Sequence, residues 1–330
     1  MRILVTGGAG FIGSAYVRNL LEGRLPATTP TTLTVLDSFT YAGNAANLGP
    51  VADDPRLRVV TGDIADPDAV ADVMPGTDVV VHFAAESHVD RSIAGSAEFV
   101  RTNVVGTHCL LGAALDAGVR RFVHVSTDEV YGSIERGSWP ETHPLAPNSP
   151  YAASKAAADL IARSYHVTHG LPVLVTRCSN TYGPYQHPEK LIPLAISRLL
   201  DGGTVPLYGD GRQVREWLHV DDHCRGIALV AERGRPGEVY NVGGGTPLAN
   251  RDLIARLLAA TGSGWAQVAH VADRKAHDRR YALDYRKIGR LGYRPEVGFD
   301  DGLADTVAWY ARHRSWWEPL RPAAAPGRPG

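Results

Sequence analysis

The chain has 330 residues, of which 44% are hydrophobic and 21% are charged, and its formal net charge is −1. This composition is typical of globular proteins, and the length suits one large or two modest domains. The near-neutral charge argues against a general nucleic-acid-binding surface, and polar residues interrupt the longest apolar stretch, residues 104–119, so we expect no membrane span.

Short apolar runs alternate with helical patterns through the first half of the chain. The runs are rich in Val, Leu and Ile and predict buried parallel strands at residues 3–5, 33–36, 57–60, 79–81, 122–125 and 173–175. The helical patterns lie at residues 11–24, 67–74, 98–117 and 151–169. This order predicts an α/β fold with a doubly wound parallel sheet of the Rossmann type.

The pattern changes after about residue 178, where Pro and Gly become frequent. Strand patterns return at residues 217–220 and 239–242. We therefore predict a Rossmann domain over residues 1–177, with later segments near 217–245 returning to it. Residues 178–330 then form mainly a smaller substrate-binding lobe. The tail, residues 321–330, reads RPAAAPGRPG and is predicted to be disordered because it has little apolar surface to bury.

A glycine-rich turn follows the first predicted strand and opens the first helix. It reads TGGAGFIG and places Gly7, Gly10 and Gly13 three residues apart. Such glycines permit a tight turn and close approach of the backbone to a pyrophosphate at the helix N-terminus. Asp37 ends the second predicted strand, where an acid accepts hydrogen bonds from the adenosine ribose and repels a 2′-phosphate. The pattern predicts NAD as the cofactor of residues 1–177.

A tyrosine and a lysine lie one turn apart at the start of the helix predicted at 151–169. Ser149 is a suitable N-cap, and Pro150 suits the first helical position. Tyr151 and Lys155 face the same side of the helix. A lysine ammonium favours the phenolate of a nearby tyrosine, so we expect Tyr151 to remove a hydroxyl proton during hydride transfer. The alternative is an ordinary interface helix.

Two adjacent carboxylates follow the strand predicted at 122–125. Thr127, Asp128 and Glu129 lie beyond its carboxyl end, where ligands bind in open α/β sheets. Thr127 is placed to hydrogen-bond a substrate hydroxyl beside Tyr151. Two carboxylates in one pocket can take different pKa values and divide acid and base roles. Elimination of water next to a ketone needs this division, whereas the alternative is a carboxylate that caps a turn or faces solvent.

These stretches resemble the dTDP-glucose 4,6-dehydratase family of extended short-chain dehydrogenases/reductases, and the resemblance extends to about residue 312. The resemblance rests on the motifs GGAGFIGS, LDSFTYAGN, GDIAD, VHFAAESHVDRSI, RTNVVGT, VSTDEVYG, SPYAASK, SNTYGPYQHPEKLIP, PLYGDGRQVREWLHVDDHC, VYNVGGG and DRKAHDRRYALD. The family implies that NAD oxidises carbon 4 of the glucose with Tyr151 as base. Glu129 would remove the proton of carbon 5, Asp128 would protonate the leaving hydroxyl on carbon 6, and the hydride would return to carbon 6. The implied product is dTDP-4-keto-6-deoxyglucose.

The resemblance also implies ligand neighbours at the matching motif positions. Besides the three glycines, Tyr151 and Lys155, the implied cofactor neighbours are Phe11, Ile12, Asp37, Ser38, Phe39, Thr40, Asp63, Ile64, Ala84, Ala85 and Thr102. Ser87 and Thr127 are the implied sugar neighbours. The implied nucleotide-diphosphate pocket comprises Asn180, Lys190, Leu191, Pro206, Leu207, Tyr208, Arg215, Asn241 and His277. No metal site is implied.

Three positions depart from the family pattern. Thr181 replaces a second Asn that touches the cofactor in family members, Lys275-Ala276 replaces a usual Pro-Gly, and His187 stands where an aromatic is common. None of these positions coincides with the five expected catalytic residues.

Other functions remain open. A nucleotide-sugar 4-epimerase needs Tyr151 and NAD but no carboxylate pair, a UDP-glucose 4,6-dehydratase differs only in its base pocket, and a non-catalytic NAD-binding sensor would not need the catalytic residues. The helices at 98–117 and 151–169 are implied to form a homodimer interface. Three widely spaced cysteines without a CxxC pair, and an N-terminus that runs straight into a strand pattern, predict a cytoplasmic protein without a signal peptide.

Overall fold

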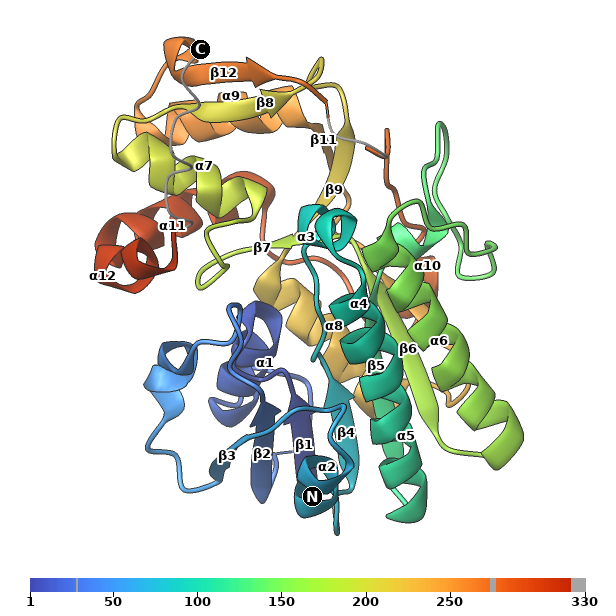
Figure 1. Ribbon diagram of the computed structural model, residues 1–330. Helices are drawn as coiled ribbons and strands as arrows, with labels where there is room; N and C mark the ends of the chain where they lie inside the picture. Colours follow the sequence, from blue (N-terminus) through green and yellow to red (C-terminus); the bar gives the residue numbers. More distant parts are fainter. Residues whose placement is uncertain (28, 274–276, 322–330) are drawn as a thin grey trace.

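A seven-stranded parallel sheet forms the centre of the protein in the computed structural model, which describes residues 1–27, 29–273 and 277–321 (Figure 1). The strand order across the sheet is β3-β2-β1-β4-β5-β6-β10, and every neighbouring pair is parallel. The strands are β1 (Arg2–Thr6), β2 (Thr32–Asp37), β3 (Leu57–Thr61), β4 (Val79–His82), β5 (Arg121–Thr127), β6 (Val173–Cys178) and β10 (Val239–Val242). The predicted doubly wound α/β fold is confirmed.

Helices cover both faces of this sheet because successive strand residues point to opposite sides. Ile3 and Val5 belong to the apolar core on the side of α1 (Phe11–Leu21) and α8 (Val220–Arg233). Leu4 belongs to the core on the opposite side. The helices over that face are α2 (Pro67–Val73), α5 (Thr107–Asp116) and α6 (Pro150–His169).

The ends of α6 follow from its sequence. The Ser149 side chain accepts the N–H of Ala152 at 3.1 Å, and Pro150 occupies the first helical position, as predicted. Gly170 ends the helix in the left-handed region at φ 73°. This well-defined start fixes the position of Tyr151 on the first turn of the helix.

The helix expected over 98–117 is not one regular helix. It consists of α4 (Ala97–Phe99), a π-helical turn (η2, Val100–Gly106) and α5. The wide turn brings Asn103 toward α6, where its Nδ2 donates to Ser154 Oγ at 2.8 Å. The same side chain bonds the backbone N–H and carbonyl of Glu86. The π turn is therefore accompanied by tertiary hydrogen bonds, which cannot be predicted from the hydrophobic periodicity of the segment.

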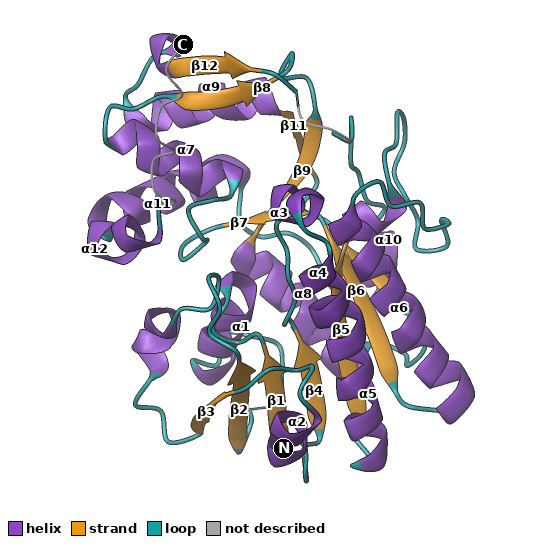
Figure 2. Ribbon diagram, in the orientation of Figure 1, coloured by secondary structure: helices purple, strands orange, loops and turns teal. Residues whose placement is uncertain are grey.

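A smaller lobe follows, built from three helices and two small sheets (Figure 2). Its helices are α7 (Leu191–Leu200), α9 (Asn250–Thr261) and α11 (Phe299–Arg312). One sheet has the order β11-β9-β7, from β7 (Asn180–Tyr182), β9 (Val214–His219) and β11 (Thr246–Ala249), and the other pairs β8 (Val205–Tyr208) with β12 (Val268–Val271). These elements share an apolar core of their own.

The strand expected at 217–220 forms as β9 but does not return to the main sheet. It pairs with β7 and β11, and the chain becomes helical at Val220, where α8 begins. Of the segment near 217–245, β10 joins the main sheet, and α8 and Leu218 of β9 pack into the core on one face of it. The division of the chain at residue 178 stays a prediction.

Short elements complete the chain. They are α3 (Val89–Ala94), α10 (Arg286–Gly289), α12 (Arg314–Trp317), and the 3-10 turns η1 (Ala45–Val51), η3 (Asp128–Tyr131), η4 (Trp265–Gln267) and η5 (Glu318–Leu320). Arg321, the first residue of the tail predicted to be disordered, donates to the Ser197 carbonyl at 2.9 Å and pairs with Asp201. The rest of that tail lies outside the described residues. Of the helices the structure describes, none is both long enough and apolar enough to cross a membrane.

Candidate functional site

A cleft of about 360 Å³, here called the main cleft, opens at the carboxyl ends of β1, β2, β4, β5 and β6. The strand order reverses between β1 and β4, and ligands of open α/β folds bind at such a switch point. A second hollow of about 200 Å³, the side pocket, lies toward the smaller lobe. Both are lined by Ser87, Glu129, Asn180, Thr181, Gln186, Glu189 and Lys190.

The glycine-rich turn forms the floor of the main cleft beside β1. Gly7 has φ +70°, and a Cβ there would lie 2.5 Å from the backbone N of Ala84. A Cβ on Gly13 would lie 2.2 Å from the Gly7 carbonyl oxygen. The nearest atom to a Cβ on Gly10 is the Gly7 carbonyl oxygen at 3.3 Å, and Gly10 lines the cleft. Gly7 and Gly13 thus permit the turn itself, whereas Gly10 leaves room for a ligand.

Asp37 lies at the end of β2 and organises the loop around it. Its carboxylate accepts the backbone N–H groups of Ala9 at 2.8 Å and Phe39 at 2.9 Å. Burial raises the pKa of Asp37, and these two hydrogen bonds oppose that effect. The side chain lines the main cleft, where its remaining lone pairs suit ribose hydroxyls.

The structure brings the expected cofactor residues together with one exception. Those that line the main cleft are Gly7, Gly10, Phe11, Ile12, Gly13, Asp37, Ser38, Thr40, Asp63, Ile64, Ala84, Ala85, Thr102, Tyr151 and Lys155. Phe39 is not part of the lining. Its backbone is left-handed at φ 49°, and its ring packs against the apolar core instead.

The five expected catalytic residues all line the main cleft. Thr127 ends β5, and its hydroxyl accepts the Glu129 N–H at 3.3 Å as the chain enters η3. Tyr151 and Lys155 come from the first turns of α6. The end of strand β5 and the turn after it therefore supply Thr127, Asp128 and Glu129, and helix α6 supplies the other two residues.

Asp128 is a buried carboxyl within this group. It is 2% exposed, and its Oδ2 has no hydrogen-bond partner among the described residues. Burial raises the pKa of Asp128 well above its ordinary value, and the charges of Glu129 and Glu216 add to this effect. A raised pKa favours the protonated carboxyl, which is the form that can donate a proton, and this fits the acid role expected from the sequence.

Tyr151 and Lys155 differ from the simple expectation. Burial raises the pKa of Tyr151 well above its ordinary value, and the Glu129 charge raises it further, while a hydrogen bond with Thr127 lowers it. Lys155 is not among the groups that shift this pKa. Its ammonium donates to the Val125 carbonyl at 2.8 Å, and burial lowers its pKa to about 8. Within the protein, burial thus outweighs the effect of the lysine that the sequence predicted.

A buried polar network, which the sequence did not reveal, lies behind Lys155. Arg177 Nε donates to Asp159 at 2.8 Å, and His124 contacts the other oxygen of Asp159 at 3.3 Å. The Asp159 charge partly offsets the lowering of the Lys155 pKa. Arg177 also donates to the Tyr131 hydroxyl at 2.9 Å.

Asn241 belongs to this network rather than to a ligand pocket. It is fully buried, and its Oδ1 accepts the Tyr131 hydroxyl at 2.8 Å. Its Nδ2 donates to the carbonyls of Trp139 at 2.9 Å and Asp284 at 3.2 Å. The amide thus bonds groups inside the protein and lines neither hollow, and the phosphate contact expected from the sequence stays a prediction.

The remaining expected substrate residues do line the two hollows. Ser87 and Thr127 line the main cleft, and those around the side pocket are Ser87, Asn180, Lys190, Leu191, Pro206, Leu207, Tyr208, Arg215 and His277. Lys190 Nζ donates to the Ser87 carbonyl at 2.7 Å, which joins the two lobes. The Arg215 guanidinium stacks 4.2 Å from the Tyr281 ring centroid and donates to the Asp278 carbonyl.

The positions that depart from the family pattern have different surroundings. The Thr181 hydroxyl contacts His223 Nδ1 at 3.1 Å and lies at the boundary of both hollows. His187 lines the main cleft. Lys275 and Ala276 lie outside the described residues.

Some lining residues were not expected from the sequence. Glu86, Gln186 and Glu189 all line the main cleft, and all three lie inside motifs that carried the resemblance. Their positions in those motifs were the available signal. Among the described residues, no cluster of three or more His, Cys, Asp or Glu side chains is arranged to hold a metal ion.

Comparison with known proteins gives full-length matches. The family described as GDP-mannose 4,6 dehydratase matches residues 4–306. A dTDP-glucose 4,6-dehydratase from Streptomyces antibioticus is 63% identical, with 99% of each chain covered. The crystal structure of DesIV, a dTDP-glucose 4,6-dehydratase from Streptomyces venezuelae with NAD bound, has a TM-score of 0.96 and 65% identity, covering 97% of this chain and 100% of that one.

Epimerases of the same fold are more distant. The UDP-glucose 4-epimerase of Thermus thermophilus, solved with NAD, has a TM-score of 0.86 and 32% identity, covering 95% of this chain and 100% of that one. The fold is thus shared by both groups of enzymes, while the sequence is much closer to the dehydratases.

Proposed function

The chain belongs to the dTDP-glucose 4,6-dehydratase family, and on that premise we propose that it is an NAD-dependent hydro-lyase that converts dTDP-glucose to dTDP-4-keto-6-deoxyglucose. The observation that carries the proposal is the buried Asp128 carboxyl, with its raised pKa, next to Glu129 and in the same cleft as Tyr151. A dehydration needs an acid and a base in one place, and a simple dehydrogenase does not.

The residues present fit NAD. The open surface at Gly10 and the N-terminus of α1 suit the diphosphate, and Asp37 suits the ribose of the adenosine. When bound, NAD would supply hydride transfer from carbon 4 and back to carbon 6, and the return of hydride to carbon 6 would be completed by return of a proton to carbon 5. No net oxidation occurs, so the reaction needs a cofactor that stays in place.

The side chains of the protein move the protons. Tyr151 takes the proton of the sugar 4-hydroxyl, with Thr127 hydrogen-bonded beside it. The ketone at carbon 4 then acidifies the proton on carbon 5, and Glu129 removes it. Asp128 gives its proton to the leaving hydroxyl of carbon 6, for which its protonated form is required.

The rival functions are distinguished by this acid. A 4-epimerase oxidises and reduces carbon 4 and has no leaving hydroxyl to protonate, so it does not need a buried carboxyl with a raised pKa such as Asp128. A UDP-glucose 4,6-dehydratase shares the whole mechanism and differs in the nucleobase of its substrate, which is uracil instead of thymine. The side pocket, with Tyr208 and His277, supports binding of the nucleotide of the substrate.

The assembly and location are also part of the proposal. Four apolar side chains on η2 and α6 are about half exposed or more, namely Val100, Val105, Leu160 and Val167. Such a grouping of exposed apolar residues supports a homodimer through these helices. The cysteines Cys109, Cys178 and Cys224 are free thiols, which supports a reducing compartment such as the cytoplasm.

The experiment is a parallel incubation of the purified protein with dTDP-glucose and UDP-glucose, followed by mass spectrometry of the sugar nucleotides. The proposal expects loss of one water from dTDP-glucose at a higher kcat/KM than from UDP-glucose. Preference for UDP-glucose would transfer the mechanism to the other nucleotide. Formation of a 4-epimer without loss of water would contradict the dehydratase proposal.

A further inference from the structure

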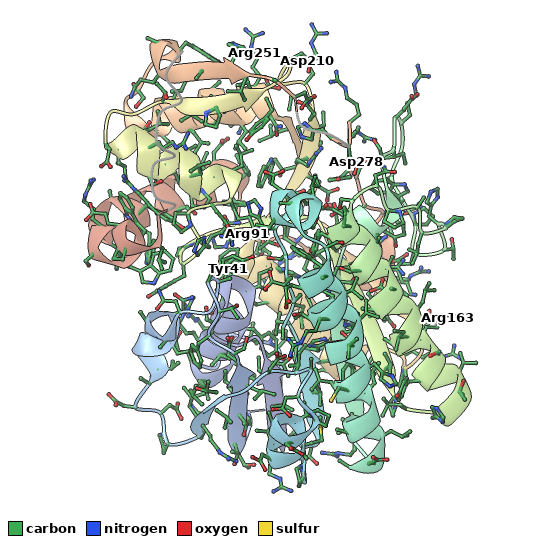
Figure 3. All side chains as sticks on the ribbon, in the orientation of Figure 1. Tyr41, Arg91, Arg163, Asp210, Arg251 and Asp278 are labelled. Atoms are coloured by element: carbon green, nitrogen blue, oxygen red, sulfur yellow. The ribbon has the colours of Figure 1, made fainter. Side chains whose placement is uncertain are left out.

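Three segments that are distant in sequence meet at the rim of the main cleft. They are the loop after β2 (residues 38–43), the segment after β4 (residues 86–91) and the loop that enters the smaller lobe (residues 186–190). Ser38, Thr40, Ala42 and Gly43 line the cleft beside Asp37, so the first loop forms the wall of the cofactor site. Tyr41 from this loop and Arg91 from α3 do not line the cleft, and Figure 3 shows them close together where the two lobes meet.

Tyr41 is surrounded by partners from the other two segments. The Arg91 guanidinium carbon lies 3.8 Å from its ring centroid, and the His187 ring meets it edge-on at 5.8 Å. Burial raises the pKa of the Tyr41 hydroxyl, and the charge of Glu86 raises it further. The Tyr41 ring is therefore packed against a guanidinium from one segment and an imidazole from the other.

Arg91 joins Tyr41 to the smaller lobe. Its Nε and one terminal nitrogen each lie 3.2 Å from the same oxygen of Glu189. The Glu189 side chain is only 7% exposed, whereas the Arg91 side chain is 49% exposed. His88 and His187 also approach this carboxylate, each at 3.9 Å. Arg91 thus contacts the loop 38–43 through the Tyr41 ring and residues 186–190 through the ion pair with Glu189.

We propose that Arg91 is a positioning residue that holds the loop 38–43 against residues 186–190 and so slows the departure of NAD. The proposal rests on the proposed function only in naming the cofactor. A dinucleotide seated against Ser38, Thr40 and Gly43 cannot leave unless this loop moves outward, and outward movement separates Tyr41 from Arg91. The same contact links cofactor retention to the loop that carries Lys190, which binds the Ser87 carbonyl beside the substrate.

A purely structural surface pair would behave differently. Arg91 is half exposed but Glu189 is buried, so loss of Arg91 lowers the unfolding temperature under either view, and stability alone does not distinguish the two. The proposal instead places the effect in the rate of cofactor release. That rate is a property of the loaded protein in the absence of sugar turnover.

The test measures release of NAD from the purified holoenzyme, with alcohol dehydrogenase and ethanol in excess to report free NAD by fluorescence. Arg91→Ala is expected to release NAD about five- to twentyfold faster than the wild type, from the loss of one partly exposed cation–π contact and one ion pair. Arg251→Ala is the matched control. Arg251 also stacks over an aromatic ring, Trp265, but lies at the far end of the smaller lobe (Figure 3), and this variant is expected to release NAD at the wild-type rate.

A second pair of variants separates the ring from the hydroxyl of Tyr41. Tyr41→Ala is expected to match Arg91→Ala, and the double variant is expected to be no faster than either, because both changes break one contact. Tyr41→Phe keeps the ring under Arg91 and is expected to release NAD more slowly than Tyr41→Ala. These variants also keep the proposal testable if Arg91→Ala does not fold.

The proposal is overturned if NAD release from Arg91→Ala and Tyr41→Ala stays within about twofold of the wild type, or if Arg251→Ala accelerates it equally. Sugar turnover by the wild type is assayed separately. A wild-type protein that retains NAD but does not dehydrate dTDP-glucose would contradict the proposed function, while faster release from Arg91→Ala would still support the role of Arg91.

Discussion

Replacement of Asp128 by Asn separates proton donation from every other property of the site. The amide has nearly the shape of the protonated carboxyl, but it has no acidic proton to give to the leaving hydroxyl. Among the described residues, the carboxyl group has one side-chain hydrogen bond, a long one accepted from the Thr127 hydroxyl at 3.3 Å. Asp128→Asn is therefore expected to change the free energy of unfolding by no more than about 1 kcal/mol.

The effect on catalysis is expected to be far larger. General acid catalysis contributes about 10²–10⁴-fold in rate, which corresponds to roughly 3–5 kcal/mol in the activation free energy. The kcat for water loss should fall by that factor in Asp128→Asn. Because Glu129, Tyr151 and Thr127 remain, the variant should still exchange the carbon 5 proton of the sugar with solvent.

The assay is incubation in deuterated water with mass spectrometry of the sugar nucleotide. Asp128→Asn is expected to incorporate deuterium at carbon 5 without losing water, and Glu129→Gln is expected to do neither. Glu98→Gln is the control, because Glu98 lines the same cleft without a role in the chemistry. Water loss from Asp128→Asn at the wild-type rate would refute the assignment of Asp128 as the acid.

Three further predictions concern the pH dependence of stability, cofactor binding and the role of Asn241. The raised pKa of Asp128 means that the folded state holds more protons than the unfolded state between the ordinary carboxyl pKa and the raised folded-state pKa, so wild-type stability falls with rising pH across that window relative to Asp128→Asn. Thermal unfolding of both proteins across the pH range checks this, and parallel curves would contradict it. Gly10→Ala should weaken NAD binding with little change in unfolding temperature, since within the protein the added methyl meets only the Gly7 carbonyl oxygen at 3.3 Å. Calorimetric titration with NAD measures the loss of affinity, and an unchanged affinity would argue against a ligand at this turn. Asn241→Ala should lower the free energy of unfolding by about 1–3 kcal/mol, because the Asn241 amide donates hydrogen bonds to carbonyls inside the protein. The KM for dTDP-glucose should stay nearly unchanged, and a large rise in KM would support the predicted role of Asn241 in the phosphate site.

The elements that local sequence controls were predicted well. The six strands of the first half have runs of Val, Leu and Ile that fit a buried parallel sheet, and the start of α6 follows from Ser149 and Pro150. The five expected catalytic residues meet in one cleft because strand ends and a helix start gather at one edge of a parallel sheet.

Features set by tertiary contacts were not predicted. The π turn at η2 accompanies hydrogen bonds of Asn103 with Glu86 and Ser154, which no local pattern reports. The strand pattern of β9 predicts a strand but not its partners, and the strand pairs with β7 and β11. The direction of a side chain is equally hidden, as Asn241 shows by pointing into a buried network instead of a pocket.

The contact between Tyr41 and Arg91 illustrates the same limit over a longer distance. Both residues lie in motifs that carried the family resemblance, but only the folded chain places the guanidinium 3.8 Å from the ring. Their separation of 50 positions in the sequence gave no reason to pair them.

The central claim is that the hydride of carbon 4 returns to carbon 6 of the same sugar within one active site. The most direct test is incubation of the purified protein, without added NAD, with dTDP-glucose that carries deuterium at carbon 4. The account predicts a product that has lost one water and carries the deuterium at carbon 6. Water loss with no deuterium at carbon 6, or no water loss even with NAD added, would contradict it.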